Sequence, residues 1–309
     1  MAALWMLVSG LFFTAHGVFV KLAAGRFGLG ELMLYRSLFI VVAIVLFTRA
    51  AGWTLATPHW RAHLVRSVAG VVSMLLFFAC LAHAPLATAV TLNYTSPLFL
   101  ALITGLLLRE RVGVLSVAAI ATGFAGVVAL LQPWADASPI GAGLVGLAGG
   151  AVAAMAYLGI RRLGAAGEPE WRTVFYFGLL GLLAGAAALP FTGATPVRVA
   201  DLPVLAAIGA CALASQLAMT FAYSRGATLV VATLSYSGVL FAGLYDLLAT
   251  GDAPSIAGWL GMSLIAGAGL MTVVARRTQA ARTTLVHPDS SRLPAASSRP
   301  HGPRTTTPR

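Results

Sequence analysis

The chain has 309 residues, of which 59% are hydrophobic and only 9% are charged, and its mean hydropathy is +0.89. A soluble domain carries about 25% charged residues, so this composition excludes a water-soluble globular protein and indicates a chain that lies mostly in lipid. The net charge of +11 does not indicate nucleic-acid binding, because the basic residues sit in short gaps between apolar runs and in the C-terminal stretch, and build no aromatic-interleaved face.

Ten apolar runs follow one another along the chain. About 20 apolar residues cross a bilayer as a helix, and backbone groups in lipid must be hydrogen-bonded within the helix. The sequence therefore predicts an all-α polytopic membrane protein with ten transmembrane helices. The predicted spans are residues 4–22, 31–48, 67–84, 86–108, 113–131, 140–160, 173–191, 203–223, 227–249 and 255–275.

The stretch 91–102 returns, 142 residues later, as residues 233–244. Tyr94 corresponds to Tyr236, and the same offset relates Ser73 to Ser215. An odd number of spans in each copy would turn the second copy upside down in the membrane. The sequence thus predicts two inverted five-helix repeats, residues 1–133 and 140–277, which are typical of carriers with a binding site near the membrane midplane.

Basic residues are distributed unequally between the two sides of this topology. The positive-inside rule then predicts that both termini lie in the cytoplasm. Residues 278–309 are rich in Pro, Ser, Thr and Arg and are expected to form a disordered basic cytoplasmic tail. One set of predicted loops holds Arg49, Arg61, Arg66, Arg109, Arg111, Arg161, Arg162, Arg172 and Arg225, and the other set holds Lys21, Arg26 and Arg198.

Ionisable residues inside a membrane span are costly and indicate function. Arg36 is a candidate for binding an anionic substrate group, or for pairing with Asp246 as an outer gate. The alternative is that both side chains snorkel to the nearby surface, with Arg36 held by Glu31. His16 is a candidate for proton coupling, although a lone helix histidine is more often a packing residue.

Polar residues at corresponding positions in the two copies are expected to line a substrate cavity, or alternatively to bond neighbouring helices. Pro97 is a candidate hinge, because it leaves a carbonyl of its helix unpaired. Three further tyrosines, Tyr157, Tyr176 and Tyr223, are either cavity aromatics or interfacial anchors. The polar candidates are Asn93, Tyr94, Ser96, Gln216, Ser235 and Tyr236.

Three segments resemble the EamA domain: residues 96–99 (Ser-Pro-Leu-Phe), residues 108–111 (Leu-Arg-Glu-Arg) with a following span that contains Gly123 and Gly126, and the arginine-bearing segment 31–36. Two tandem EamA domains make up the drug/metabolite transporter superfamily, and the resemblance covers residues 1–277. It implies a secondary transporter of small metabolites, commonly an exporter of bacterial inner membranes. The second copy departs from the pattern, with Val239 at the position of Pro97.

The expected function is transport, with export favoured, of an amino acid-like or other small polar solute across the inner membrane by alternating access. The alternatives are an uptake carrier for a riboflavin- or S-adenosylmethionine-like metabolite, and a non-transporting membrane enzyme, channel or receptor. The expected partners are lipid and a small-molecule substrate, with protons as a candidate coupling ion. No enzyme activity, metal site or cofactor is expected, because His59 and His63 are predicted to lie in a loop without a third ligand and no phosphate-binding loop occurs.

Overall fold

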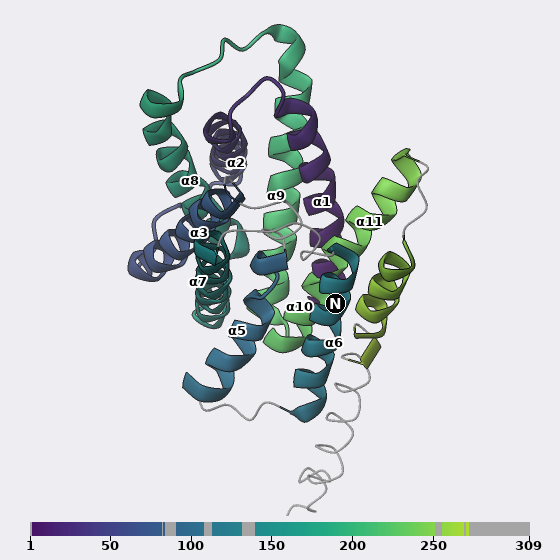
Figure 1. Cartoon of the computed structure of the whole chain (residues 1–309). Helices are drawn as coiled ribbons and strands as arrows, with labels where there is room; N and C mark the ends of the chain where they lie inside the picture. The colour runs from purple at the N-terminus through teal and green to yellow at the C-terminus, as the bar shows by residue number, and fades with distance from the viewer. Residues whose placement is uncertain are drawn as a thin grey trace, which may run out of the picture.

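The computed structural model describes residues 2–81, 83, 91–107, 113–131, 140–250, 255–268 and 270–271, and every regular element in this part of the chain is a helix (Figure 1). The C-terminal tail predicted for residues 278–309 lies outside the described residues. The helices are α1 (Ala2–Ala23), α2 (Leu29–Ala50), α3 (Trp60–Leu81), α5 (Ser96–Leu102) with a π-helical continuation (Ile103–Leu107), α6 (Val114–Leu131), α7 (Ile140–Ala165), α8 (Glu170–Thr192), a 3-10 turn (Val199–Asp201), α9 (Leu202–Arg225), α10 (Thr228–Ser235), α11 (Ser237–Thr250) and a helix over Ile256–Ala268.

Five of these segments are long and apolar enough to cross a membrane, so the chain is a multi-pass membrane protein. They correspond to five of the ten predicted spans. Three shorter apolar helices cover parts of three further predicted spans. The long segments are Ala2–Val20, Leu29–Ala50, Ile140–Ala165, Glu170–Phe191 and Val199–Arg225, and the shorter ones are Val114–Ala129, Thr228–Ala242 and Ile256–Ala268.

The predicted start of the third span is wrong. Helix α3 begins at Trp60 rather than at residue 67, and the backbone carbonyl of His59 already accepts hydrogen bonds from the amides of Ala62 and His63. His63 and Arg66 therefore lie on a helix and not in a loop, and both are buried. The first residues of the helix, Trp60 to Ala62, are exposed, so the burial begins at His63.

The fourth and ninth predicted spans are both interrupted at corresponding positions. The helical residues 91–93 are separated from α5 by a turn at Tyr94 and Thr95, and Tyr236 separates α10 from α11. In the first copy Pro97 lies in the first turn of α5, where its missing N–H costs no hydrogen bond. The break in the second copy forms without a proline.

Helix packing is exchanged between the two halves of the chain. Helix α1 packs along α9 and α3 packs along α7, while α2 packs against α8 (Figure 1). The 142-residue offset relates α1 to α7, α3 to α9 and α2 to α8. The offset therefore relates the α1–α9 pair to the α7–α3 pair. The α2–α8 pair joins two helices that correspond to each other.

Hydrogen bonds repeat this correspondence. Ser73 Oγ on α3 donates to the carbonyl of Gly149 on α7 (2.9 Å), and Ser215 Oγ on α9 donates to the carbonyl of Ser9 on α1 (3.1 Å). Ser9 Oγ in turn lies 3.0 Å from the carbonyl oxygen of Ser215 and donates to it. The two serines that the sequence aligns thus join equivalent helix pairs.

We expect Ser73→Ala and Ser215→Ala each to lower the free energy of unfolding by about 0.6 kcal/mol, the usual value of an interhelical hydrogen bond in a membrane. Unfolding in mixed micelles would measure both. Ser263→Ala is the control, because Ser263 Oγ donates within its own helix to the carbonyl of Trp259 (2.9 Å). A loss in the control equal to that in the other two variants would contradict the role given to these interhelical bonds.

At one end of the bundle, the α2–α3 connection is bonded to the α7–α8 connection. Glu168 accepts hydrogen bonds from Thr57 Oγ1 and from Arg172 Nη1 (2.9 Å), and its Oε2 lies 3.2 Å from His63 Nε2. Arg172 Nη2 also donates to the carbonyl of Thr54 (2.9 Å). We call this cluster of Thr57, His63, Glu168 and Arg172 the Glu168 cluster.

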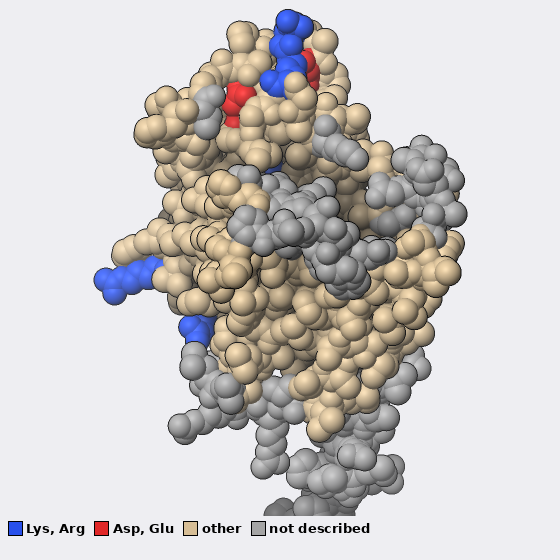
Figure 2. Space-filling view, viewed as in Figure 1, with Lys and Arg blue, Asp and Glu red and all other residues tan. Residues whose placement is uncertain are grey.

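At the opposite end of α2, the α1–α2 connection is bonded to the α8–α9 connection. Arg26 Nε pairs with Asp201 Oδ2 at 3.0 Å, and its Nη2 donates to the carbonyl of Pro196 (2.8 Å). Glu31 accepts a hydrogen bond from Thr195 Oγ1 (3.0 Å). Figure 2 shows acidic and basic side chains gathered at this end, where α8 runs into α9, above a described surface that is largely uncharged. Such a surface suits contact with lipid.

Candidate functional site

The two helix breaks meet inside the bundle. Tyr94 and Tyr236 lie at the breaks, and their ring centroids are 5.9 Å apart. Tyr236 is fully buried, and a Cβ added at Gly123 of α6 would lie 2.5 Å from its Cδ2. Glycine at 123 is therefore required for α6 to approach the Tyr236 ring.

A second tyrosine pair lies beside the first. The rings of Tyr157 on α7 and Tyr223 on α9 are stacked, with centroids 4.8 Å apart and planes 8° apart. The hydroxyls of Tyr157 and Ser96 form a hydrogen bond, and Tyr157 interacts electrostatically with Tyr94. We call these two tyrosine pairs, which come from both halves of the chain, the tyrosine cluster.

Two arginines extend this cluster toward α8. The guanidinium carbon of Arg66 lies 4.2 Å from the ring centroid of Phe177, and that of Arg36 lies 5.8 Å from the same centroid. The two guanidinium groups are thus brought together over the same ring. The arrangement brings two cations, one phenyl ring and the tyrosine cluster into a single polar centre, which we call the arginine–tyrosine centre.

Several polar atoms of this region have no hydrogen-bond partner among the described residues, although they are buried. Such atoms can bind a substrate without breaking bonds that hold the protein together. They are Arg36 Nε, Arg66 Nε and Nη1, Gln216 Oε1, Thr220 Oγ1, Tyr223 OH, Tyr236 OH and Ser237 Oγ.

Of the residues predicted for the site, Tyr94, Ser96, Tyr236 and Arg36 lie in the arginine–tyrosine centre. The buried Nδ1 of His16 has no partner in the described part of the chain, and the ring contact of His16 is with Phe13.

The other predicted residues are placed less directly. Asn93 is half-buried, one residue before Tyr94, and Gln216 has its buried Oε1 without a partner within the described structure. Ser235 Oγ donates to the carbonyl of Ala232 in its own helix (2.7 Å). Pro97 directly follows the first break, in the first turn of α5, and its role as a hinge stays a prediction.

Arg36 does not use either acidic partner considered for it. Its Nη1 donates to Met74 Sδ (3.4 Å), while the Glu31 carboxylate accepts from Gly28 N (2.8 Å) and Thr195. The side chain of Asp246 lies outside the described residues. The described contacts of Arg36 are therefore with a thioether and an aromatic ring.

Sequence reasoning missed Arg66, because the segment before residue 67 was taken for a loop. A signal was present: His63, Ser67, Gly70 and Ser73 follow one another at helical spacing and, with Arg66, form a polar and small-residue face. Phe177 carried no such signal, since one phenylalanine among many in apolar spans is not distinctive.

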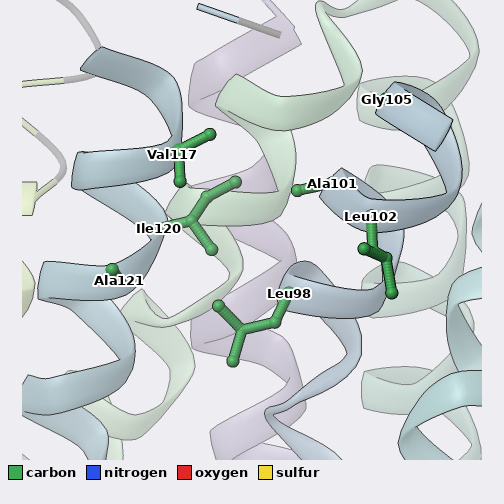
Figure 3. Close-up of a pocket in the computed structure, with 7 residues that line it drawn as sticks. All are labelled: Leu98, Ala101, Leu102, Gly105, Val117, Ile120 and Ala121. Atoms are coloured by element: carbon green, nitrogen blue, oxygen red, sulfur yellow. The ribbon is translucent and has the colours of Figure 1, made fainter. Parts of the chain in front are cut away.

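A cavity of about 330 Å³ lies elsewhere, between α5 and α6. Figure 3 shows Val117 and Ile120 of α6 facing Leu98 and Ala101 of α5. The cavity offers no polar side chain to select a solute, and two of its residues, Leu102 and Val117, are 52% and 48% exposed. It suits lipid chains better than a metabolite. Its lining is Leu98, Ala101, Leu102, Gly105, Val117, Ile120 and Ala121.

Comparison with known proteins gives consistent results. Residues 1–132 match the model of the EamA-like transporter family. The riboflavin transporter of Rhizobium johnstonii is 31% identical over 273 residues, which cover 87% of this chain and 89% of that protein. The pseudopaline exporter CntI of Pseudomonas aeruginosa is 28% identical over 263 residues, which cover 85% of this chain and 90% of that protein.

The fold also has a counterpart among solved structures. One crystal structure superposes with a TM-score of 0.78 at 22% sequence identity, covering 90% of this chain and 98% of that chain. At this identity the likeness concerns the fold alone.

Proposed function

Since the chain belongs to the EamA-like transporter family, we propose that it is a secondary transporter that exports a small organic metabolite across a bacterial inner membrane by alternating access. The family predicted from residues 96–99, 108–111 and 31–36 is confirmed. A carrier of this kind opens one central binding site in turn to each side of the membrane.

We propose that the two halves are inverted repeats of five spans each, residues 1–133 and 140–277. The exchanged packing of α1 with α9 and of α3 with α7 supports this proposal. The matched bonds of Ser73 and Ser215, and the helix breaks at Tyr94 and Tyr236, support it further. Under the positive-inside rule, both termini and the basic tail would lie in the cytoplasm.

The observation that carries the proposal is the meeting of two broken helices at Tyr94 and Tyr236. Discontinuous helices beside a polar centre are where secondary carriers bind their substrates. The breaks belong to different halves, so movement of one half against the other would open the centre to one side and then to the other. Proton coupling through His16 and gating by Asp246 stay predictions.

Two classes of solute suit the centre. The stacked pair of Tyr157 and Tyr223 provides a flat aromatic surface, and the arginines provide cations, so amino acid-like solutes and flat ring systems are both candidates. Among the relatives, one is a riboflavin transporter and another is a pseudopaline exporter. Uptake of a riboflavin-like vitamin is therefore the second candidate function.

Counterflow in proteoliposomes tests the proposal. Vesicles loaded with pools of amino acids, organic acids, nucleosides or riboflavin would exchange labelled members of the same pool, and gradients of each sign would then show the preferred direction. Saturable counterflow in at least one pool is expected. An absence of counterflow from every pool, with folded protein in the vesicles, would contradict the proposed function.

Tyr236→Phe should raise the substrate concentration that gives half-maximal counterflow about tenfold, which corresponds to a loss of ~1.4 kcal/mol in binding free energy. The Tyr236 hydroxyl is buried and has no partner in the described part of the protein, so its removal breaks no bond that stabilises the fold. Tyr245→Phe on α11 is the matched control, because Tyr245 is 41% exposed. Equal half-saturation in both variants would remove Tyr236 from the substrate site.

A further inference from the structure

We propose that Arg36 and Arg66 together bind a substrate that carries two anionic groups, a small organic dicarboxylate. This inference deepens the proposed function and rests on it. It assigns a substrate class to the arginine–tyrosine centre and gives a role to Arg66, which the sequence had placed in a loop.

Both arginines are buried without an acidic partner. Arg36 is 9% exposed and Arg66 is 2% exposed, and neither has a carboxylate within ion-pair distance among the described side chains. Their Nε atoms, and Nη1 of Arg66, have no hydrogen-bond partner in that part of the chain. The contacts that do exist are with the Phe177 ring and with Met74 Sδ.

These contacts are too weak to balance the burial of two charges. A cation–π contact is a modest attraction, whereas burying an ion without a counter-ion carries a large desolvation cost. The desolvation cost of the two guanidinium groups is therefore not offset by their contacts with the described residues. Two negative charges supplied by a ligand would offset it.

The acidic side chains that the structure describes, which do not include that of Asp246, are engaged elsewhere. The Glu168 carboxylate is shared by Arg172 and His63, and that of Glu170 is paired with Arg225 (2.9 Å). At the other end of the bundle, Asp201 pairs with Arg26 and Glu31 bonds Thr195. Within the described structure, Arg36 and Arg66 thus contrast with three other arginines that have carboxylate partners.

The protein is shaped to hold Arg66 at this place. A Cβ added at Gly70 would lie 2.8 Å from Phe177 Cε2 and 3.2 Å from Arg66 Nη1, and one added at Gly159 would lie 2.8 Å from Arg66 Cβ. Glycine at these two positions lets α3 approach both α7 and α8 around the guanidinium. The side chain is therefore packed into the bundle and is not reaching outward to a membrane surface.

The geometry favours two acidic groups over one. Both guanidinium groups lie against the same phenyl ring, and each is a planar fork that matches a carboxylate. A monoanion would leave one of the two charges uncompensated. A dicarboxylate can place one group on each arginine.

Binding to the purified full chain tests this inference without requiring transport. The probes are succinate, glutarate and 2-oxoglutarate, compared with butyrate and valerate at equal ionic strength and neutral pH. We expect a saturable rise of the unfolding midpoint with at least one dicarboxylate, because a ligand that binds only the folded state stabilises it. The monocarboxylates should give no saturable rise.

Arg36→Gln and Arg66→Gln should each weaken dicarboxylate binding at least tenfold. Arg61→Gln, on the exposed part of the same helix as Arg66, is the matched control and should bind like the wild type. Without ligand, both Gln variants should unfold at the same midpoint as the wild type or at a higher one. Each substitution removes a buried positive charge that has no carboxylate partner among the described side chains. A purely structural arginine would give the opposite result, a lower midpoint.

Three results would overturn the inference: no saturable stabilisation by any of the dicarboxylates, equal stabilisation by the monocarboxylates, or full binding by both Gln variants. Counterflow separates this failure from failure of the proposed function. If the wild type and both Gln variants exchange another solute equally well, transport stands and the dicarboxylate site is wrong. If dicarboxylates bind but no pool is exchanged, the site stands and the transport proposal is wrong.

Discussion

Gly150→Val is expected to destabilise the protein by about 3 kcal/mol or more and to abolish transport, because the new side chain has no room. A Cβ at this position would lie 2.8 Å from the carbonyl oxygen of Leu92 and closer still to Thr95 Oγ1. These atoms belong to the first helix break, which would have to move away from α7. The unfolding midpoint in detergent and counterflow in vesicles would measure the two effects.

Gly143→Val is the matched control. Gly143 lies on the same helix, two turns earlier, and a Cβ there meets no atom within 4 Å. Both changes replace glycine by the same β-branched residue in a helix, so differences in helix propensity cancel. If both variants lost stability equally, the close approach of α7 to the break at Thr95 would not be what makes glycine necessary.

Glu168→Gln is expected to cost about 3 kcal/mol of stability, because it leaves buried His63 and Arg172 without the carboxylate that they share. The Glu168 side chain is 3% exposed. Burial alone would raise its carboxyl pKa, but hydrogen bonds from Thr57, Arg172 and His63 outweigh burial and hold that pKa below its ordinary value of 4.5. The carboxylate therefore contributes to stability in its charged form.

The sign of the pH dependence follows from this lowered pKa. The contribution of Glu168 is complete above pH 4.5, and it is lost as the pH falls below 4.5 through the folded-state value. The stability difference between wild type and Glu168→Gln should therefore shrink as the pH falls below 4.5. A difference that stays constant below that pH would contradict the assignment.

Glu170→Gln is the matched control for charge. Glu170 lies two residues further on and pairs with Arg225, whose side chain is 62% exposed. Exposed pairs contribute less than about 1 kcal/mol. The control should therefore unfold within about 1 kcal/mol of the wild type, and a loss as large as that of Glu168→Gln would show that general charge balance, rather than the Glu168 cluster, is responsible.

Local patterns predicted much of this architecture. Apolar runs predicted helices, and Pro97 predicted the place of the first break within a few residues. The alignment of Ser73 with Ser215 predicted a correspondence that the structure repeats as equivalent hydrogen bonds between helices. Each of these features depends on residues that are close in sequence, or on the repeat itself.

What the sequence could not predict depends on distant residues. His63 is buried because Glu168, 105 residues later, lies against it, and without that partner the segment looks like a polar loop. The second break has no proline; instead α1 packs closely there, where Thr14 Oγ1 donates to the Gly238 carbonyl (3.1 Å) and a Cβ at Gly10 would lie 3.2 Å from Gly238 N. Arg36 and Arg66 likewise come together at Phe177, a residue of a third helix, because both guanidinium groups lie over its ring.

Two guanidinium groups that have no carboxylate partner among the described side chains have a consequence for voltage. One elementary charge moved across 100 mV of membrane potential changes the free energy by about 2.3 kcal/mol. When access to the centre changes sides, the voltage drop moves from one side of these charges to the other, so the empty protein would respond to the potential. An interior-negative potential would favour the empty state that opens inward.

A bound dianion would cancel the charge of both arginines, and the loaded protein would then reorient almost without regard to voltage. The potential would thus act on the return of the empty protein and bring it back to the side where an exported solute loads. Under this arrangement the membrane potential alone could drive export, with two negative charges leaving the cell in each cycle and no second ion required.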